Sequence, residues 1–231
     1  MSQRLSMVSE KDATGIAKEV IEASNQLLGR SANLLKIIAT HSPLVARWWL
    51  GFVAAVRQPT LGSSTEMRLR NLASVKTSLV NECAYCTSHT RILGEALGFT
   101  AAEFELMQSD AYKTSDAFSR REKAAIAWAE AMTLNTAKRD MALWKEMKEV
   151  FTETEIVEIS MIVGLFNVAN RLNDSFWTDL ETEEFNRRQG RAMNVQIDAL
   201  EQFAAGFPKS GATQRAGRPD EISRQVLPAA E

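Results

Sequence analysis

The chain has 231 residues, with 27 Lys and Arg against 29 Asp and Glu, and a formal net charge of −2 at pH 7. An apolar share of 45% is typical of a globular protein, and the length suits one substantial domain with short extensions. A chain so close to neutral does not build the basic field that tracks phosphates, so we expect no nucleic-acid partner.

The apolar runs are too short for a membrane span. The two longest, 44–56 and 156–169, are interrupted by Arg47 and Glu158, whereas a span needs about 20 apolar residues. The first ten residues lack the apolar core of a secretory signal. We therefore predict a cytoplasmic protein with no membrane partner. In that reducing compartment a close cysteine pair is more typical of redox or metal chemistry than of a structural disulfide.

Helical spacing of apolar residues runs along most of the chain. Asp12 is the expected N-cap of the first helix, and Gly98 is the expected C-terminal stop of the fifth. No stretch alternates apolar and polar residues between turn signals, so we predict an all-α fold without a sheet. The expected helices cover 12–28, 33–40, 43–58, 64–81, 84–97, 101–109, 120–134, 138–151, 153–172 and 182–205.

Four of these helices begin with the spacing of a capping box. In that arrangement a Ser or Thr hydroxyl accepts from the third backbone amide, and a Glu three residues later reaches back to the first. One such pair is weak evidence, but four pairs that each open an amphipathic run define the helix starts. The pairs are Ser63 with Glu66, Thr100 with Glu103, Ser119 with Glu122, and Thr152 with Glu155.

The ends of the chain differ from its middle. We assign 1–29 to an N-terminal helical extension, 30–205 to the main helical domain and 206–231, which holds three of the five prolines, to a flexible tail. Within the domain, 63–81 and 152–170 are capped helices of similar length that both lead into polar turns. This similarity predicts a duplicated helical unit.

Both cysteines and one of the two histidines lie within seven residues, as Cys83, Cys86 and His89. The spacing of three places them on one side of a helical turn, where the thiols can form a disulfide. A helix N-terminus and a nearby imidazole both lower a thiol pKa from its free value of about 8.5. The motif therefore combines a nucleophile, a second thiol that can condense with a sulfenic acid, and a proton donor or acceptor.

Two other interpretations of the cysteine pair stay open. The pair could belong to a zinc site with His89, completed by His41 or Glu82, although the chain has no second Cys-X-X-Cys. The two residues could also be inert thiols in the core, because free cysteine is often buried.

A polar stripe interrupts the last long apolar helix. Asn167, Asn170, Arg171 and Asp174 share one side of it, and buried polar groups of this kind usually form hydrogen bonds between helices. If the stripe faces the cysteines, Arg171 could hold an anionic substrate.

The residues around the motif resemble the AhpD-like, or carboxymuconolactone decarboxylase-like, family. The resemblance covers about residues 30–185 and includes His-Ser-Pro at 41–43, Val-Asn-Glu-Cys-Ala-Tyr-Cys at 80–86 and Phe-Asn-Val-Ala-Asn-Arg-Leu-Asn-Asp at 166–174. It implies an all-helical fold with a duplicated unit and a homotrimer or homohexamer. We expect no cofactor and no bound metal. In the cysteine-bearing branch it also implies thiol peroxidase activity, with Cys86 attacking the peroxide and Cys83 resolving.

This sequence departs from the family pattern at three positions. The family's relay glutamate falls on Asn71, the relay histidine falls on Thr90, and Tyr85 lies where some members have a histidine between the cysteines. His89 comes one residue early, and one helical step turns a side chain by about 100°. We consider Glu82, Glu66 and Glu130 as substitutes for the missing glutamate.

These observations predict a thiol-dependent peroxidase or disulfide oxidoreductase that uses Cys86, Cys83 and His89. Glu82, Asn71, Tyr85 and Arg171 are the expected supporting residues. The predicted partners are a hydroperoxide or other small substrate and a thiol or dithiol reductant. The alternatives are a decarboxylase or isomerase of a small carboxylic acid, which would use His89 and Arg171, and a non-catalytic helical oligomer.

Overall fold

The computed structural model describes residues 2–57, 63–182, 184–185, 203 and 205. Every regular element within these ranges is a helix, which confirms the all-α fold. The α-helices are α1 (Gly15–Leu28), α2 (Asn33–His41), α3 (Pro43–Arg57), α4 (Met67–Val80), α5 (Ala84–Ala96), α6 (Ala101–Met107), α7 (Arg120–Thr133), α8 (Met141–Val150) and α9 (Glu153–Phe176), and two 3₁₀ turns are η1 (Asp110–Lys113) and η2 (Ala137–Arg139).

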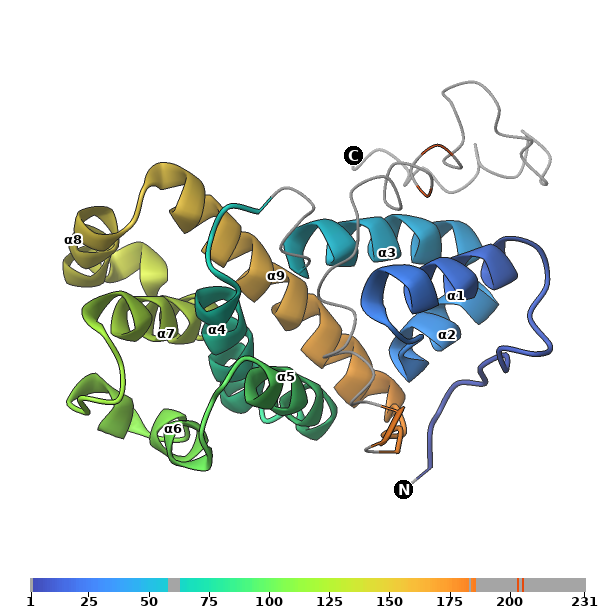
Figure 1. The fold of residues 1–231 in the computed structure, drawn as a ribbon, viewed down its shortest axis with the longest axis horizontal. Coiled ribbons are helices and arrows are strands. Elements are labelled where there is room, and N and C mark those ends of the chain that lie inside the picture. The colour runs from blue at the N-terminus through green and yellow to red at the C-terminus, as the bar shows by residue number, and fades with distance from the viewer. Residues whose placement is uncertain (1, 58–62, 183, 186–202, 204, 206–231) are drawn as a thin grey trace, which may run out of the picture.

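The long helix α9 crosses the centre of the molecule (Figure 1). Helices α1, α2 and α3 lie on one side of it, and α4 to α8 lie on the other. Helix α9 packs most extensively on α4 and also contacts α5, α7, α3 and α2. It therefore lies between these two groups of helices and contacts both of them.

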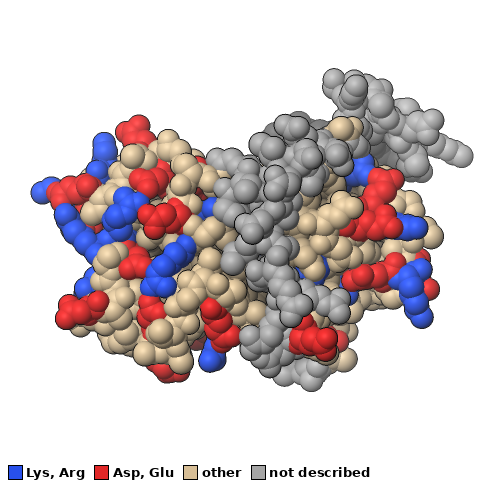
Figure 2. Space-filling model, in the orientation of Figure 1, with Lys and Arg blue, Asp and Glu red and all other residues tan. Residues whose placement is uncertain are grey.

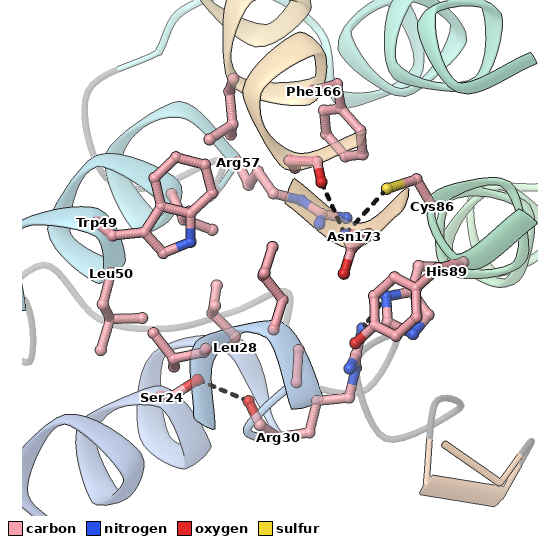
Figure 3. A pocket seen from close by; sticks show the side chains of 17 residues that line it. Ser24, Leu28, Arg30, Trp49, Leu50, Arg57, Cys86, His89, Phe166 and Asn173 are labelled. Carbon is pink, nitrogen blue, oxygen red and sulfur yellow. Dashed lines mark hydrogen bonds between the residues drawn. The ribbon is translucent and has the colours of Figure 1, made fainter. Parts of the chain in front are cut away.

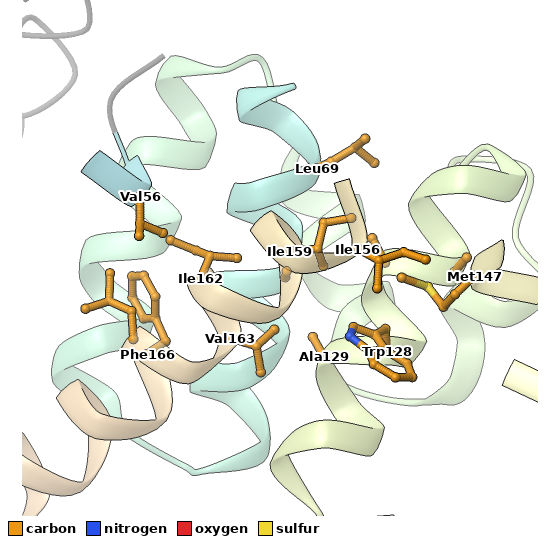
Figure 4. Packing of buried hydrophobic residues seen from close by; sticks show 14 of the residues in the cluster. Val56, Leu69, Trp128, Ala129, Met147, Ile156, Ile159, Ile162, Val163 and Phe166 are labelled. Carbon is orange, nitrogen blue, oxygen red and sulfur yellow. The ribbon is translucent and has the colours of Figure 1, made fainter. Parts of the chain in front are cut away.

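The main core forms along one face of α9. Ile159, Val163 and Phe166 recur at helical spacing and pack against α4, α5 and α7 (Figure 4). Complete burial of each such side chain stabilises the fold by about 1.5–3 kcal/mol. The same stripe becomes polar at Asn170 and Asn173, which are buried one and two turns further on. The core of α9 thus leads directly into a polar end.

Two smaller cores flank the main one. Helices α1, α2 and α3 bury an aliphatic cluster that includes Val20, Leu27 and Leu50. Helices α4, α6 and α7 close over an aromatic cluster that includes Phe104 and Tyr112. Residues 15–28 therefore pack with α2 and α3, although our predicted boundary at residue 29 stays a prediction.

Three of the four predicted capping boxes are confirmed, at Thr100, Ser119 and Thr152. The one at Ser63 is wrong, because α4 begins only at Met67 and its N-cap, Glu66, makes no side-chain cap. The carboxylate of Glu158 on α9 binds the backbone amides of Ser64 and Thr65 instead, at 2.9 and 2.7 Å. The carboxylate that binds this segment thus comes from Glu158 on a distant helix and not from Glu66.

Other terminus predictions had mixed outcomes. Helix α1 begins at Gly15 after Thr14, so the predicted cap at Asp12 is wrong; Asp12 accepts from the Ser9 hydroxyl at 2.5 Å in the preceding turn. Gly98, with φ +86°, follows the end of α5 as predicted. The helix expected over 182–205 and the tail at 206–231 lie almost entirely outside the described residues. The duplicated unit and the homo-oligomer stay predictions.

The surface carries both signs of charge. On the face shown in Figure 2, basic and acidic side chains are interspersed over α7 and α8. Arg120 of α7, for example, binds Glu146 of α8 at 2.7 Å. Among the described residues, no helix is both long and apolar enough to cross a membrane.

Candidate functional site

A tight turn between α4 and α5 positions the two cysteines. Glu82 adopts a left-handed conformation, with φ +57°, and its backbone N–H donates to the carbonyl of Leu79 at 3.0 Å. The chain reverses there, so that Cys83 becomes the N-cap of α5 and its sulfur accepts from the Cys86 amide at 3.4 Å. Cys86 occupies the first turn of α5, where the helix N-terminus favours negative charge.

Cys86 lines a cavity of about 90 Å³, whereas Cys83 is fully buried outside its lining. Helices α1, α2, α3, α5 and α9 and the residues around Arg30 supply the walls (Figure 3). Most of these side chains are apolar. The polar residues of the lining are Ser24, Arg30, Arg57, Tyr85, Cys86, His89 and Asn173.

The two thiols differ in their electrostatic surroundings. The hydrogen bond with Cys86, followed by burial, raises the pKa of Cys83 far above its ordinary value of 9.0. The carboxylate of Asp174 acts in the same direction. Cys83 therefore stays protonated at physiological pH, and Cys86 is the one of the two sulfurs that lines the cavity.

Asn173 of α9 contacts the Cys86 sulfur directly. Its Nδ2 lies 3.3 Å from Cys86 Sγ and donates to the carbonyl of Ala169 at 2.9 Å. Because a carbonyl can only accept, this second contact identifies the atom as Nδ2. An amide N–H at that distance stabilises a thiolate better than a thiol.

His89 is held by two charged residues. Arg30 Nη2 lies 3.2 Å from His89 Nδ1, and Glu181 Oε2 lies 2.8 Å from His89 Nε2. A guanidinium can only donate, so Nδ1 is the acceptor and Nε2 carries the proton that Glu181 accepts. Burial and then the Arg30 cation lower the pKa of His89 from 6.5 to about 4. His89 is therefore neutral at pH 7.

Glu181 ties the segment that follows α9 to this wall. Its carboxylate accepts from the Tyr85 hydroxyl at 2.6 Å and from the Asn33 amide at 2.5 Å. Burial would raise the pKa of Glu181, but hydrogen bonds, first from His89 and then from Tyr85 and Asn33, hold it well below its usual range. Arg30, whose side chain is only 4% exposed, lies 3.8 Å away as its counter-ion.

This cluster predicts that acid destabilises the protein. His89 binds a proton near pH 6.5 when unfolded but only near pH 4 when folded, so the unfolded state takes up more protons as the pH falls. We expect the free energy of unfolding to decrease by about 2 kcal/mol between pH 7 and pH 5 from this group alone. Urea unfolding at both pH values measures it.

The matched control is His89→Gln, which can still donate to Glu181 but does not titrate. It should lose most of the pH dependence between pH 7 and pH 5. An unchanged dependence in His89→Gln would assign the effect to other groups.

Arg57 places a second cation at the cavity. Its guanidinium extends from the end of α3 to Asn173 (Figure 3) and lies 5.3 Å from the centre of the Phe166 ring. Burial and then Arg30 lower the pKa of Arg57 from 12.5 to about 9, and Cys86 has the opposite effect. Arg57 thus remains charged at pH 7 and lines the same cavity as Cys86.

The two positions where the family has its relay lie together. Asn71 Nδ2 donates to the backbone carbonyl of Thr90 at 3.2 Å, and the Thr90 hydroxyl donates to the carbonyl of Cys86 at 2.9 Å. Both residues are buried outside the lining of the cavity, and neither can exchange a proton as Glu and His do. The structure has hydrogen bonds where the family pattern has a relay.

The remaining predicted residues lie in different places. Tyr85 and His89 line the cavity with Cys86, whereas Glu82 is exposed at the turn. Arg171 is also exposed and donates to Asn167, so it does not face the cysteines. The expected hydrogen bonds from this stripe do form: Asn167 accepts from Asn81 Nδ2 and donates to the Thr133 hydroxyl, and Asn170 donates to the carbonyl of Thr77.

Four residues of the site are absent from the predicted site residues. Arg30 follows Gly29, whose left-handed φ of +74° ends α1, and Arg57 is the last residue of α3. Asn173 was part of a recognised motif, and its helical spacing from Phe166 was the available signal. Glu181 follows α9 without any motif. Among the described residues, no three His, Cys, Asp or Glu are grouped so as to hold a metal ion.

Comparison with known proteins identifies the relatives of this chain. No family model matches it. The uncharacterized protein YdfG of Bacillus subtilis (strain 168) is 30% identical over 119 residues, which are 49% of this chain and 77% of YdfG. The structure of a peroxidase-related protein from Ralstonia eutropha JMP134, described as an alkylhydroperoxidase AhpD core, is also similar. It is 18% identical with a TM-score of 0.65, and the match covers 80% of this chain and 96% of the Ralstonia chain.

The chain has the AhpD-like fold. Its identity to YdfG makes the two proteins relatives, and the solved structures show the fold. The debrominase Bmp8 shares that fold. The structure of its cysteine-to-alanine variant with bound 2,3,4-tribromopyrrole is 20% identical with a TM-score of 0.67, and the match covers 88% of this chain and 98% of the Bmp8 chain.

Proposed function

We propose that this AhpD-like protein is a thiol-dependent oxidoreductase that reduces hydroperoxides through Cys86 and Cys83. The observation that carries the proposal is the asymmetry of the pair. Cys86 lines the cavity next to Arg57 and Asn173, and Cys83 lies directly behind it as a buried thiol. This asymmetry supports a division of roles in which Cys86 attacks the substrate and Cys83 then reacts with the oxidised Cys86.

The reaction has two steps within the protein. The Cys86 thiolate attacks the outer oxygen of the hydroperoxide, the O–O bond breaks, and the inner oxygen leaves as an alkoxide that takes up the proton lost by Cys86. Sulfur is oxidised to a sulfenic acid and the peroxide is reduced to an alcohol. The Cys83 thiol then displaces water from the sulfenic acid, and a Cys83–Cys86 disulfide forms. An external thiol or dithiol returns the pair to its reduced form.

The activation of Cys86 does not depend on a Glu–His relay in this proposal. Asn71 and Thr90 replace those residues, and both ring nitrogens of His89 are occupied by Arg30 and Glu181. The N-terminus of α5, the Arg57 cation and the Asn173 amide favour the thiolate instead. His89 acts as a neutral positioning residue that fixes the wall beside Cys86.

The likeness to Bmp8 favours reductive dehalogenation as a second candidate. The same dithiol could take a halogen from carbon, with the ring gaining a proton, the halide leaving and the two sulfurs forming a disulfide. The carboxylic-acid alternative is less supported, because it assigned the substrate to Arg171, which lies on the exposed side of α9.

A titration with tert-butyl hydroperoxide tests the proposal. One equivalent added to the reduced protein should consume both thiols, release one tert-butanol and produce a monomer lighter by two hydrogens. Peptide mapping should locate the new disulfide between Cys83 and Cys86. Protein alkylated beforehand with iodoacetamide is the control. Two thiols that survive the treatment would contradict a peroxidase, and the titration would then be repeated with a brominated pyrrole.

A further inference from the structure

Two buried polar atoms of residues that line the cavity with Cys86 have no hydrogen-bond partner within the part of the chain that the structure describes. They are Nη2 of Arg57, which is a donor, and Oδ1 of Asn173, which is an acceptor. Both residues line the cavity, and in Figure 3 the Arg57 side chain points toward Asn173. Buried groups normally find partners, because leaving them unpaired is costly. A ligand in the cavity could supply both partners.

The polarity of this pair is fixed by the protein. Asn173 Nδ2 is held by the Ala169 carbonyl and the Cys86 sulfur, so Oδ1 is the atom that faces into the cavity (Figure 3). Arg57 can only donate. The strongest electrostatic influences on Arg57 are two cations, Arg30 and Arg70, and Cys86. The complementary ligand group therefore has an acceptor for Arg57 and a hydrogen for Asn173.

We propose that Arg57 Nη2 and Asn173 Oδ1 together bind the polar head of the substrate, and that this head is an uncharged group with adjacent acceptor and donor atoms. A hydroperoxide has this arrangement, since its inner oxygen accepts and its outer oxygen carries a hydrogen. A carboxylate does not, because it would turn a second acceptor toward Asn173 Oδ1. This inference rests on the proposed function and adds the recognition of the substrate to it.

The binding mode also orients the reaction. When Asn173 Oδ1 accepts the hydrogen of the outer oxygen, that oxygen lies beside Cys86 Sγ, which is 3.3 Å from Asn173 Nδ2. The inner oxygen lies at the Arg57 guanidinium. It is the inner oxygen that gains negative charge as the O–O bond breaks, and a fixed cation stabilises such a charge where it develops. Arg57 and Asn173 are then catalytic residues of the peroxide step.

Substitution of Arg57 tests its part. Arg57→Met is close in size and removes a buried cation, a change that proteins usually tolerate, and its folding is checked by thermal melting. We expect Arg57→Met to slow the oxidation of Cys86 by tert-butyl hydroperoxide about tenfold to hundredfold. Arg57→Lys should recover part of the loss. The matched control is Arg171→Met, which removes an exposed arginine outside the cavity and should leave the rate unchanged.

Alkylation separates binding of the peroxide from stabilisation of the thiolate. Alkylation by iodoacetamide needs neither the Arg57 nor the Asn173 contact. At a pH where Cys86 is fully ionised, the alkylation rate of Arg57→Met should therefore differ from the wild-type rate by less than about threefold. An equal loss of rate in the peroxide and alkylation reactions would mean that Arg57 only stabilises the thiolate, and this would overturn the inference. A peroxide rate that does not change would overturn it as well.

A binding comparison decides the inference without any turnover. In the Cys86→Ser protein, which cannot be oxidised at this position, calorimetry should show that tert-butyl hydroperoxide binds at least about tenfold more tightly than pivalate, its carboxylate analogue. Tighter binding of pivalate would overturn the neutral-head inference. A wild-type protein that reduces no hydroperoxide would overturn the proposed function, and this binding result would still stand separately.

Discussion

Replacing Cys86 with Ser is expected to reduce kcat/KM for tert-butyl hydroperoxide by roughly a thousandfold or more. The hydroxyl of Ser has almost the volume of the thiol but does not ionise near pH 7, so the cavity keeps its shape and loses its nucleophile. Peroxide consumption in the presence of dithiothreitol measures the effect. The retained shape should leave the melting temperature close to that of the wild-type protein.

Cys83→Ser is the matched variant, and it should fail at a different step. Because Cys86 still faces the cavity, the first oxidation should proceed within a few-fold of the wild-type rate. No disulfide can follow, so a sulfenic acid should accumulate on Cys86 and be trapped by dimedone. If Cys83→Ser lost the first step and Cys86→Ser retained it, the roles of the two cysteines would be reversed.

Glu181→Gln is expected to lower the free energy of unfolding by about 3–5 kcal/mol. Glu181 is the counter-ion of Arg30, and both side chains are almost completely buried. Removing one charge of a buried pair leaves the other uncompensated, and this costs more than the pair itself contributes. His89, Tyr85 and Asn33 would also lose a charged acceptor. Urea unfolding monitored by circular dichroism measures the change.

Two control variants test whether the loss of stability comes from the buried charge pair. Asp179→Asn removes an exposed carboxylate two residues earlier in the same segment and should change the stability by less than about 0.5 kcal/mol. The double variant Arg30→Met/Glu181→Gln no longer buries an unpaired charge and should regain a large part of the loss. Equal destabilisation by Glu181→Gln and Asp179→Asn would show that the segment, and not the buried pair, accounts for the effect.

Local sequence patterns were sufficient for most of the helices. The boxes at Thr100, Ser119 and Thr152 formed because a capping box joins residues only three apart, so its energy needs no tertiary contact. The box at Ser63 did not form, because Glu158 on α9 binds the amides of the same segment. Helix starts were thus predictable wherever no distant residue competed for the backbone.

The motif predicted which residues carry the chemistry, but not how they share it. Three-residue spacing was enough to place Cys83, Cys86 and His89 on one side of the first two turns of a helix. It could not show that Cys86 faces a cavity while Cys83 is buried behind it, because that difference depends on how α5 packs against α9. Nor could it predict that both nitrogens of His89 are bound by residues 59 and 92 positions away.

By itself, the sequence determined the all-α fold, most helix boundaries and the cysteine pair, because these depend on contacts within one or two helical turns. Only the tertiary structure decided the environment of the thiol. Arg57, Asn173, Arg30 and Glu181 come from different elements and meet only when α3 and α9 pack around the cavity. Buried charges and polar groups must be satisfied across such distances, and no local pattern in a single sequence records which partners they find.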